Sequence, residues 1–319
     1  MTGPIALVVN PVATKTSRAL RAEVTRALAP HGLEWSLVTA GPGDAGRLAA
    51  RAAAEGAVVI VTLGGDGTVA DVAGVLAGGP VALAPLPGGN ANVFARAIGW
   101  PSAPSRATPL LAAAIERGAV RDAALGLLEI DGRPRVFAIN CGVGLDAATV
   151  EWIEARPRTK RRLRQAGFAV GAAVAAVRAR GVARLTLEVD GEARGEAVAV
   201  LVACGTPYTY LGSRPLDLVP GAAFDGRLAW VALLRARPHE IGGLLLRAAR
   251  GRDLPVSGPA LSGGSAESGL VVRSTDPAPV QADGEALGRH REVRISSGPV
   301  LRVVDPGTPL LKTDPGRTI

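Results

Sequence analysis

A strand, a glycine-rich loop and a helix follow one another in residues 58–76, and this arrangement constrains the chain more than any other feature. The apolar run 58–63 is typical of a buried strand, and residues 69–76 have helical spacing. Between them lies the sequence G-G-D-G-T at 64–68. Glycines let a backbone approach a ligand closely, and the first N–H groups of a helix attract anions. The segment therefore predicts a phosphate site, with an ordinary tight turn as the alternative.

The chain repeats this construction on both sides of the loop. The apolar run 81–86 leads into P-G-G-N-A-N at 87–92 and then into a short helical segment at 93–98. Upstream, the apolar run 5–9 leads into small and polar residues at 10–15. In open α/β sheets, ligands bind outside the carboxyl ends of the strands. We therefore expect the three loops to line one crevice.

The order of these motifs resembles the diacylglycerol kinase catalytic-domain family of lipid kinases, which includes sphingosine-type kinases. The ordered set is N-P at 10–11, G-G-D-G-T, the P-G-G-N-A-N loop ahead of F-A-R, and D-G-E at 283–285. Two further landmarks are similar, N-C-G-V-G-L-D at 140–146 and F-D-G-R-L at 224–228. The resemblance spans essentially the whole chain. The G-G-D-G-T loop alone also occurs in NAD kinases and phosphofructokinases, so only the ordered set is specific.

The resemblance implies an ATP-dependent phosphotransferase that uses Mg²⁺. Phosphoryl transfer needs positioned phosphates and a base for the attacking hydroxyl. The resemblance places this base at Asp283, a nucleotide or magnesium contact at Glu285, and a bound magnesium at Asp225. The residues that it implies in nucleotide binding are Asn10, Pro11, Val12, Thr14, Thr39, Gly64, Gly65, Asp66, Gly67, Thr68, Gly88, Gly89, Asn90 and Asn92.

Several of these residues also have purely structural interpretations. Asp-Gly is a common hairpin turn, and the chain has it at 131–132 and 190–191 as well. Asp225 has a turn aspartate as its alternative, although the metal is preferred, and Thr39 could equally be an ordinary end of a strand. The chain also departs from the family pattern: it has Asn90 where many members have Thr or Ser, Val93 where many have Asp, and no Ser-Gly ending in the loop 10–15.

Changes in periodicity predict two domains. Residues 1–122 alternate strand-like runs with helical ones at 17–29, 44–55, 69–76 and 106–116, which predicts a nucleotide-binding α/β domain with a mostly parallel sheet. The resemblance adds that this domain is similar to NAD kinase and phosphofructokinase and that residues 299–319 return to it. Residues 123–298 are β-rich, which predicts an antiparallel β-sandwich, and the resemblance implies that this domain takes the lipid substrate. Helices are expected within it at 151–180 and 239–250, and a turn or mobile loop at 257–268.

Composition bounds the class of protein. The 319 residues are 48% hydrophobic, which is ample for two cores. The two cysteines, Cys141 and Cys204, lie far apart without metal-ligand spacing and are expected to be reduced core residues. The longest apolar stretch, 166–177, is shorter than the roughly 20 residues that a membrane span needs, and no signal segment opens the chain. We therefore expect a cytoplasmic protein that associates peripherally with the inner face of a membrane.

The chain carries a net charge of +8, with a pI near 10.6, which favours polyanionic partners. A cluster of cations could dock on anionic phospholipid, or could simply be the solvated end of a helix. The cluster consists of Arg156, Arg158, Lys160, Arg161, Arg162 and Arg164. Nucleic-acid binding is disfavoured because aromatic residues make up only 3% of the chain and no recognition motif is present.

Together these observations predict an ATP-dependent lipid kinase that converts diacylglycerol to phosphatidate at a membrane surface. Another lipid acceptor, such as a sphingoid base or a lipid-linked glycerol, is the nearest alternative. NAD kinase fits less well, because the P-G-G-N-A-N loop and the D-G-E segment do not match its pattern. A catalytically silent nucleotide- or lipid-binding relative is the third alternative, and the presence of both Asp66 and Asp283 argues against it. A homodimer is left open.

Overall fold

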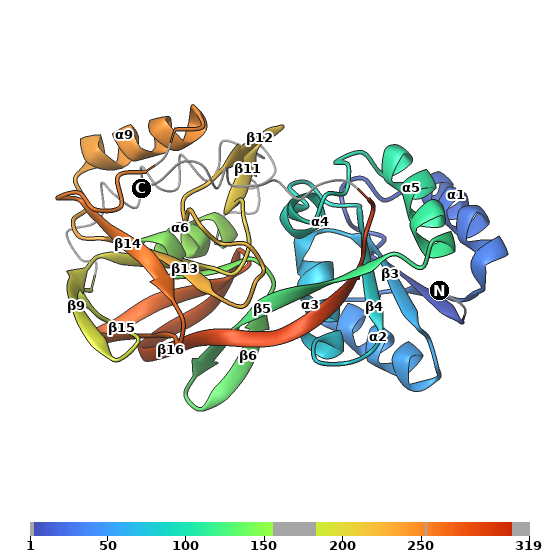
Figure 1. Cartoon of the computed structure of the whole chain (residues 1–319), viewed down its shortest axis with the longest axis horizontal. Helices are drawn as coiled ribbons and strands as arrows, with labels where there is room; N and C mark the ends of the chain where they lie inside the picture. The colour runs from blue at the N-terminus through green and yellow to red at the C-terminus, as the bar shows by residue number, and fades with distance from the viewer. Residues whose placement is uncertain (1–2, 156–182, 253, 308–319) are drawn as a thin grey trace. The chain divides into compact units, whose positions relative to one another are not determined.

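The structure is a computed structural model that describes residues 3–155, 183–252 and 254–307 (Figure 1). The chain divides into two compact units, Met1–Leu125 with Pro299–Ile319, and Gly126–Gly298. Two long strands, β5 (Val120–Ile130) and β16 (Glu285–Val304), run from one unit into the other. The basic cluster that begins at Arg156 lies outside the described residues.

The first unit is an α/β fold around a parallel sheet. Its strands pair in the order β4-β3-β1-β2, all parallel, and the end of β16 adds a parallel partner to β4. Helix α1 packs on α5 and helix α2 on α3, and the two pairs lie on opposite faces of the sheet (Figure 1). The elements are β1 (Ile5–Val9), α1 (Arg18–Leu28), a 3₁₀ turn (Ala29–His31), β2 (Leu33–Val38), α2 (Asp44–Ala54), β3 (Val59–Gly64), α3 (Asp66–Leu76), β4 (Ala82–Pro87), α4 (Val93–Ala97) and α5 (Pro104–Glu116).

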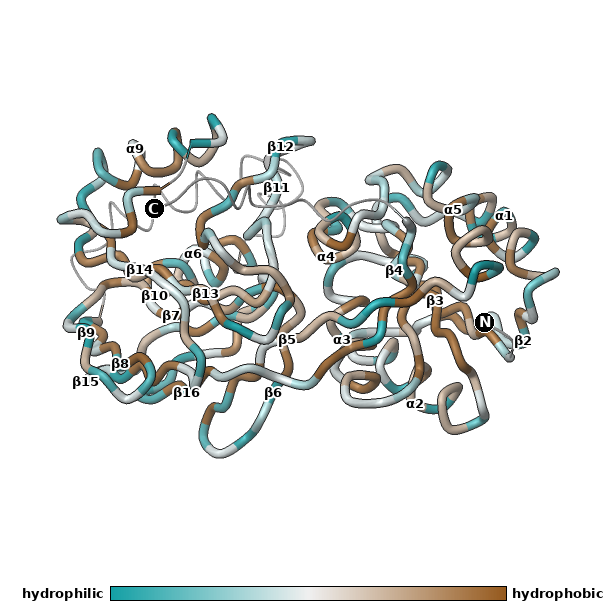
Figure 2. Tube along the Cα trace, viewed as in Figure 1, coloured by the Kyte–Doolittle hydropathy of each residue, from teal (hydrophilic) through white to brown (hydrophobic). Residues whose placement is uncertain are grey.

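The apolar runs of the sequence become the central strands of this sheet. Every residue of β1, β3 and β4 is buried, as expected for parallel strands covered on both faces, and Figure 2 shows β3 as a hydrophobic stretch of the tube. β2 lies at the edge and alternates between partly buried and exposed residues. Helix α1 begins after Ser17, whose hydroxyl accepts a hydrogen bond from the Leu20 N–H at 3.1 Å.

The second unit is antiparallel and strand-rich, so both parts of the predicted fold class are confirmed. Strand β15 pairs with three strands: with β16, with β7 through residues 280–282, and with β8 through residues 270–274. The elements, after β5, are β6 (Arg133–Phe137), β7 (Asn140–Gly144), α6 (Leu145–Glu154), β8 (Leu185–Val189), β9 (Glu192–Ala197), β10 (Ala199–Ala203), β11 (Thr209–Leu211), β12 (Arg214–Leu216), β13 (Leu228–Leu233), α9 (Pro238–Ala249), β14 (Leu261–Ala266) and β15 (Leu270–Ala282).

One segment of the second unit differs from the sequence-based prediction. Residues 257–268 were expected to form a turn or mobile loop, but residues 261–266 form strand β14, which pairs with β13. The small residues serve close packing, because a Cβ atom on Gly263 would lie 2.8 Å from the Trp230 carbonyl oxygen. The Ser and Gly composition therefore reflects a crowded strand and not a loop.

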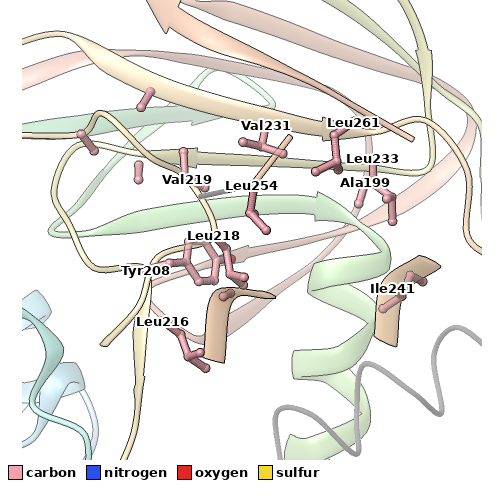
Figure 3. Close-up of a cluster of buried hydrophobic side chains, with 14 of the residues drawn as sticks. Ala199, Tyr208, Leu216, Leu218, Val219, Val231, Leu233, Ile241, Leu254 and Leu261 are labelled. Carbon is pink, nitrogen blue, oxygen red and sulfur yellow. The ribbon is translucent and has the colours of Figure 1, made fainter. Parts of the chain in front are cut away.

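A hydrophobic cluster forms a core of the second unit. Side chains from β13, β14 and α9 meet in it, among them Val231, Leu261 and Ile241 (Figure 3). Tyr208 contributes its ring to the same cluster, so a phenol is anchored in an otherwise apolar environment. None of the described helices is both long and apolar enough to cross a membrane.

Candidate functional site

The three loops that follow β1, β3 and β4 are joined by main-chain hydrogen bonds. The Asn10 N–H donates to the Leu63 carbonyl at 2.9 Å, and the Gly88 N–H donates to the Gly64 carbonyl at 2.7 Å. The Lys15 N–H donates in turn to the Gly88 carbonyl at 2.8 Å. The loops therefore form one connected structure at the carboxyl edge of the parallel strands, where α/β proteins bind ligands.

Three polar side chains of the predicted site are used to build these loops. The Asn10 amide donates to the Thr68 hydroxyl at 3.0 Å and accepts from the Val12 N–H at 3.1 Å. The Asn92 amide closes its own loop, since its oxygen accepts from the Gly89 N–H at 2.8 Å and its nitrogen donates to the Gly89 carbonyl at 3.0 Å. These contacts fix the backbone on which the other residues of the site are carried.

Four of the glycines occupy positions where neighbouring atoms leave no room for a side chain. A Cβ atom on Gly64 would lie 2.5 Å from the Thr68 hydroxyl, and one on Gly88 would lie 2.8 Å from the Gly64 nitrogen. A Cβ atom on Gly65 would press on the Gly89 Cα at 3.3 Å, and one on Gly89 would collide with the Gly65 Cα. The sequence suggested that the glycines serve ligand approach, but Gly65, Gly88 and Gly89 serve the close approach of two loops, and Gly64 leaves room for Thr68 within its own loop.

Gly67 is the glycine that faces open space. It is exposed, and a Cβ atom built on it would meet no atom of the described chain within 4 Å. It lies in the first turn of α3, where the first intrahelical hydrogen bond runs from the Val69 N–H to the Gly65 carbonyl at 3.1 Å. The cap residue Gly65 supplies no side-chain hydrogen bond to this turn. The helix N-terminus is therefore open on the Gly67 side, in a form that suits an anion.

Positive charge surrounds the same loops. The Lys15 ammonium donates to the Ser102 carbonyl at 2.9 Å, and its pKa is lowered by partial burial and by the nearby charge of Arg96.

Asp66 anchors α4, since its Oδ1 atom accepts from the Phe94 N–H at 3.3 Å.

The remaining predicted nucleotide residues differ in exposure. Pro11, Val12, Thr14 and Asn90 are exposed. Thr39 is buried after β2, where its N–H donates to the Val9 carbonyl at 2.9 Å.

In the second unit, Asp283 occupies a tight turn between β15 and β16, and its carboxylate is held by main-chain donors. The backbone is left-handed at Asp283 and Gly284, with φ of 49° and 80°. Oδ1 accepts from the N–H groups of Ile139 at 2.8 Å and Asn140 at 3.1 Å, and Oδ2 accepts from the Ala138 N–H at 2.6 Å. The carboxylate is therefore fixed across the start of β7.

The environment of Asp283 favours a proton acceptor stronger than an ordinary aspartate. Burial of the carboxyl raises its pKa, while the three N–H donors and the charge of Arg135 lower it, and the pKa ends above the usual value. The residue as a whole is only partly buried, so the enclosed part is the carboxyl that the N–H groups hold. A raised pKa moves a carboxylate toward the range that suits a general base near neutral pH.

A buried polar network beneath this turn was missed by the sequence analysis. Gln281 Nε2 lies 2.9 Å from Asp146 Oδ2, 3.0 Å from the Tyr208 hydroxyl and 3.2 Å from Asn140 Oδ1. The Tyr208 hydroxyl donates to Asp146 Oδ2 at 2.7 Å. Burial raises the pKa of Asp146, against the lowering effect of its two hydrogen bonds. Gln281 could have been noticed as an amide among the small and apolar residues 278–282, which lead directly into the Asp283 turn.

The other two predicted residues of the second unit, Glu285 and Asp225, both pair with arginines. Glu285 is exposed and forms an ion pair with Arg135. The Asp225 carboxylate accepts from the Arg227 N–H at 3.0 Å and pairs with its guanidinium at 3.1 Å, and these contacts outweigh burial and hold the pKa of Asp225 below its usual value. Among the described residues, no group of three acidic, His or Cys side chains could hold a metal. Magnesium at Asp225 stays a prediction, because a site built from one carboxylate and carbonyl oxygens is not such a group.

Comparison with known proteins finds one matching family over part of this chain and several similar proteins that are named as lipid kinases. Residues 4–148 match the family described as "Diacylglycerol kinase catalytic domain", which confirms the predicted resemblance over that part of the chain. A protein of Pseudomonas fluorescens named "Probable lipid kinase YegS-like" is 43% identical over 112 residues, which are 32% of this chain and 38% of that relative. A protein of the same name from Pseudomonas aeruginosa is 48% identical over 88 residues, 26% of this chain and 29% of the relative. The matches thus span well under half of the relatives' length.

Solved structures agree with the fold. A diacylglycerol kinase from Bacillus anthracis is similar over 95% of this chain and 96% of its own, with a TM-score of 0.70 and 20% identity. An NAD kinase from Archaeoglobus fulgidus, solved in complex with ATP, is similar over 95% of this chain and 94% of its own, with a TM-score of 0.55 and 14% identity. At these identities the likeness shows the fold alone, which both kinds of kinase share.

Proposed function

We propose that this chain, whose residues 4–148 match a diacylglycerol kinase catalytic domain, is an ATP-dependent kinase that phosphorylates a hydroxyl of a membrane lipid, with diacylglycerol as the acceptor. The proposal rests on the three loops that hydrogen bonds join at the carboxyl edge of the parallel strands. These loops lie within the matched residues. The open first turn of α3 at Gly67 and the cations Lys15 and Arg96 supply the features that a phosphate chain needs.

The first unit binds MgATP in this proposal. The N–H groups in the first turn of α3 face the phosphates, and the exposed residues of the loops after β1 and β4 complete the contacts. Magnesium would bind together with the nucleotide and would keep several of its water ligands. No step is assigned to a metal at Asp225, because Arg227 occupies its carboxylate.

Asp283 accepts the proton of the lipid hydroxyl. A carboxylate has about four acceptor positions, and three backbone N–H groups fill positions here, two on Oδ1 and one on Oδ2. The remaining position is on Oδ2, and this is the atom that takes the proton. The lipid oxygen then forms a bond to the γ-phosphorus while the bond from that phosphorus to the β-phosphate oxygen breaks, which releases ADP.

The test is an assay of the acceptor. The protein is incubated with ATP labelled at the γ-phosphate, magnesium, and separately a diacylglycerol, a sphingoid base and NAD, and the products are identified by mass spectrometry. Labelled phosphatidate is the expected product. If the labelled product is a sphingoid base, the protein is still a lipid kinase but its acceptor is not diacylglycerol. Labelled NADP, or no product from any acceptor, would overturn the proposal.

A matched pair of glycine variants tests the nucleotide site. Gly67→Ala places a methyl group in open space at the first turn of α3, so the fold should be kept while ATP affinity falls by roughly tenfold, worth about 1.4 kcal/mol. Gly74→Ala is the control, because Gly74 also lies in α3 and faces open space. Calorimetric titration with ATP measures both affinities. Equal affinity in both variants would move the phosphates away from this turn.

We also propose that the acceptor is met on an anionic membrane surface, on the strength of the net charge of +8. Replacing Arg158, Lys160, Arg161, Arg162 and Arg164 by Gln should weaken sedimentation with vesicles that contain phosphatidylglycerol. Added salt should mimic this change, since charges are screened beyond about 8 Å at physiological ionic strength. Turnover of a short-chain substrate in detergent should be kept. Equal vesicle binding by both proteins would leave a solvated helix end as the explanation.

A further inference from the structure

Gln281 is connected to the Asp283 turn through both ends of its side-chain amide. Its Oε1 atom accepts from the Gly284 N–H at 2.9 Å, directly across the turn. Since an oxygen must face that N–H, the Nε2 atom is turned toward the interior, where Asp146 Oδ2 and Asn140 Oδ1 are acceptors. The orientation of the amide is thus set by its partners on both sides.

Asn140 links this network to the same strand that holds the Asp283 carboxylate. Its own N–H donates to Asp283 Oδ1 at 3.1 Å, and its carbonyl accepts from the Asp283 N–H at 2.8 Å. Its side-chain amide donates to the Tyr208 carbonyl at 2.9 Å. Displacement of Asn140 would therefore displace two of the hydrogen bonds that position Asp283.

The network is anchored at its far end. Tyr208 places its ring in the hydrophobic cluster of the second unit (Figure 3). Its hydroxyl donates to Asp146 Oδ2. Strand β7 leaves room for the Asp146 carboxylate only because residue 142 is glycine, since a Cβ atom there would collide with Asp146 Oδ2 and would lie 3.0 Å from Gln281 Nε2. A buried network whose members are all bonded holds one arrangement, because each lost partner leaves a polar group unsatisfied.

We infer that Gln281, backed by Asp146, Tyr208 and Asn140, is a positioning residue that holds the Asp283 carboxylate in its reactive orientation. The inference rests on the proposed function, in which Asp283 accepts the proton. Gln281 does not touch the substrate in this scheme. It acts by fixing the turn at Gly284 and the position of β7 at Asn140.

The first test is kinetic. Gln281→Met keeps the length of the side chain and removes its amide, so kcat for the lipid should fall by up to about 10²-fold, the effect of a displacement near 1 Å. The KM for ATP should change by less than about twofold, because the nucleotide is bound by the first unit. Thr149→Val is the matched control, since it removes a buried hydroxyl bonded to the Leu145 carbonyl without touching Gln281.

A double variant separates positioning from general stability. If Gln281 acts through Asp283, then Gln281→Met should reduce kcat little further in an Asp283→Asn background. Multiplying losses would mean that Gln281 supports the protein in another way and would overturn the inference. Tyr208→Phe serves as a milder variant if Gln281→Met does not fold, and the same lack of additivity with Asp283→Asn is expected of it.

Hydrogen exchange gives a readout that does not need activity. In Gln281→Met the backbone N–H groups of Ala138, Ile139 and Asn140 should exchange faster, because the carboxylate that they bond is no longer held in place. The N–H of Ser268, which is held by Asp190, should be unchanged. Unchanged exchange at all these sites would overturn the inference. If the unaltered protein phosphorylates no lipid, the proposed function fails whatever the exchange shows, so the two failures are distinguishable.

Discussion

The second unit contains the same three residues, D-G-E, in two turns, at 190–192 and at 283–285. Both turns join antiparallel neighbours, β8 to β9 and β15 to β16. Their backbones are nearly identical, with φ of 51° and 49° at the aspartates and 82° and 80° at the glycines. Each aspartate also accepts hydrogen bonds from backbone N–H groups of three consecutive residues, 267–269 in one case and 138–140 in the other. Local sequence and local geometry therefore do not separate them.

The two turns differ in what surrounds the carboxylate. Asp190 is exposed, so its small burial is outweighed by its N–H partners and the charge of Arg194, and its pKa is lowered. At Asp283 burial outweighs similar donors and the pKa is raised. Within the described parts of the chain, only the second turn contacts a buried polar network, through Gln281. The candidate base is therefore distinguished by the burial of its carboxyl and by the contact of its turn with the Gln281 network. The tripeptide does not distinguish it.

The largest expected difference between the two turns is in catalysis. Asp283→Asn keeps the shape but removes the basic carboxylate, so turnover should fall by on the order of 10²–10⁴-fold while ATP still binds. Asp190→Asn makes the same change in the same local structure and should leave turnover nearly unchanged. Steady-state kinetics and ATP titration measure both. Near-normal turnover of Asp283→Asn, under conditions where chemistry limits the rate, would move the base elsewhere, and Asp66 would be examined next.

The glutamates that follow the two turns sharpen the comparison. Glu285 pairs with Arg135, and Glu192 pairs with Arg194 at 2.9 Å. If Glu285 contacts the nucleotide side of the reaction, Glu285→Gln should weaken nucleotide affinity and turnover together, by roughly tenfold. Glu192→Gln should change neither, because an exposed ion pair is worth about 1 kcal/mol or less and lies away from the chemistry. Equal kinetics for the two variants would reduce Glu285 to a surface ion pair.

Stability should depend on pH in opposite directions at the two aspartates. The lowered pKa of Asp190 stabilises the fold above the ordinary carboxyl pKa of about 3.9, and this contribution is lost as pH falls through the lowered value. The raised pKa of Asp283 means that the folded state binds its proton more tightly, so its contribution decreases as pH rises from about 3.9 through the raised value. Urea unfolding of the protein and of each Asn variant between pH 3 and 7 gives the two difference curves, and slopes of the same sign would refute this account.

The smallest effect is expected at another Asp-Gly turn of this unit, at 131–132. Asp131 has a left-handed backbone with φ of 51° and contacts His290 Nδ1 at 3.1 Å on the exposed surface. Asp131→Asn should leave turnover unchanged and alter the free energy of unfolding by less than about 0.5 kcal/mol. Thermal unfolding and the lipid assay measure these quantities. A clear loss of turnover would show that burial does not separate the catalytic Asp-Gly turn from the other Asp-Gly turns.

Local signals predicted the first unit well. The apolar runs 5–9, 58–63 and 81–86 correspond to its central strands, β1 at 5–9, β3 at 59–64 and β4 at 82–87, and the Ser17 cap marks the start of α1. These features depend on neighbours in the sequence. The segment 257–268 was mispredicted because Gly and Ser appear as loop residues unless the crowding against Trp230 is known.

The candidate site was predictable only in part, because its decisive contacts are distant in sequence. The motif identified Asp283, but the N–H groups that hold it lie 143 to 145 residues earlier in the chain. Asp146 and Tyr208 meet Gln281 from 135 and 73 residues away. Similarly, the glycines of the two loops indicated that something approaches the backbone closely. The sequence did not indicate that the approaching group is the other loop.

The contact between Gly65 and Gly89 has an evolutionary consequence. Because a Cβ atom at either position would press on the Cα of the other, the two loops cannot acquire side chains there independently. A homologue that carries alanine at one of these positions should show a compensating change in the backbone, or an insertion, in the opposite loop. The two positions should therefore covary as a pair across descendants of this fold, although they belong to different motifs and are separated by a complete helix and strand.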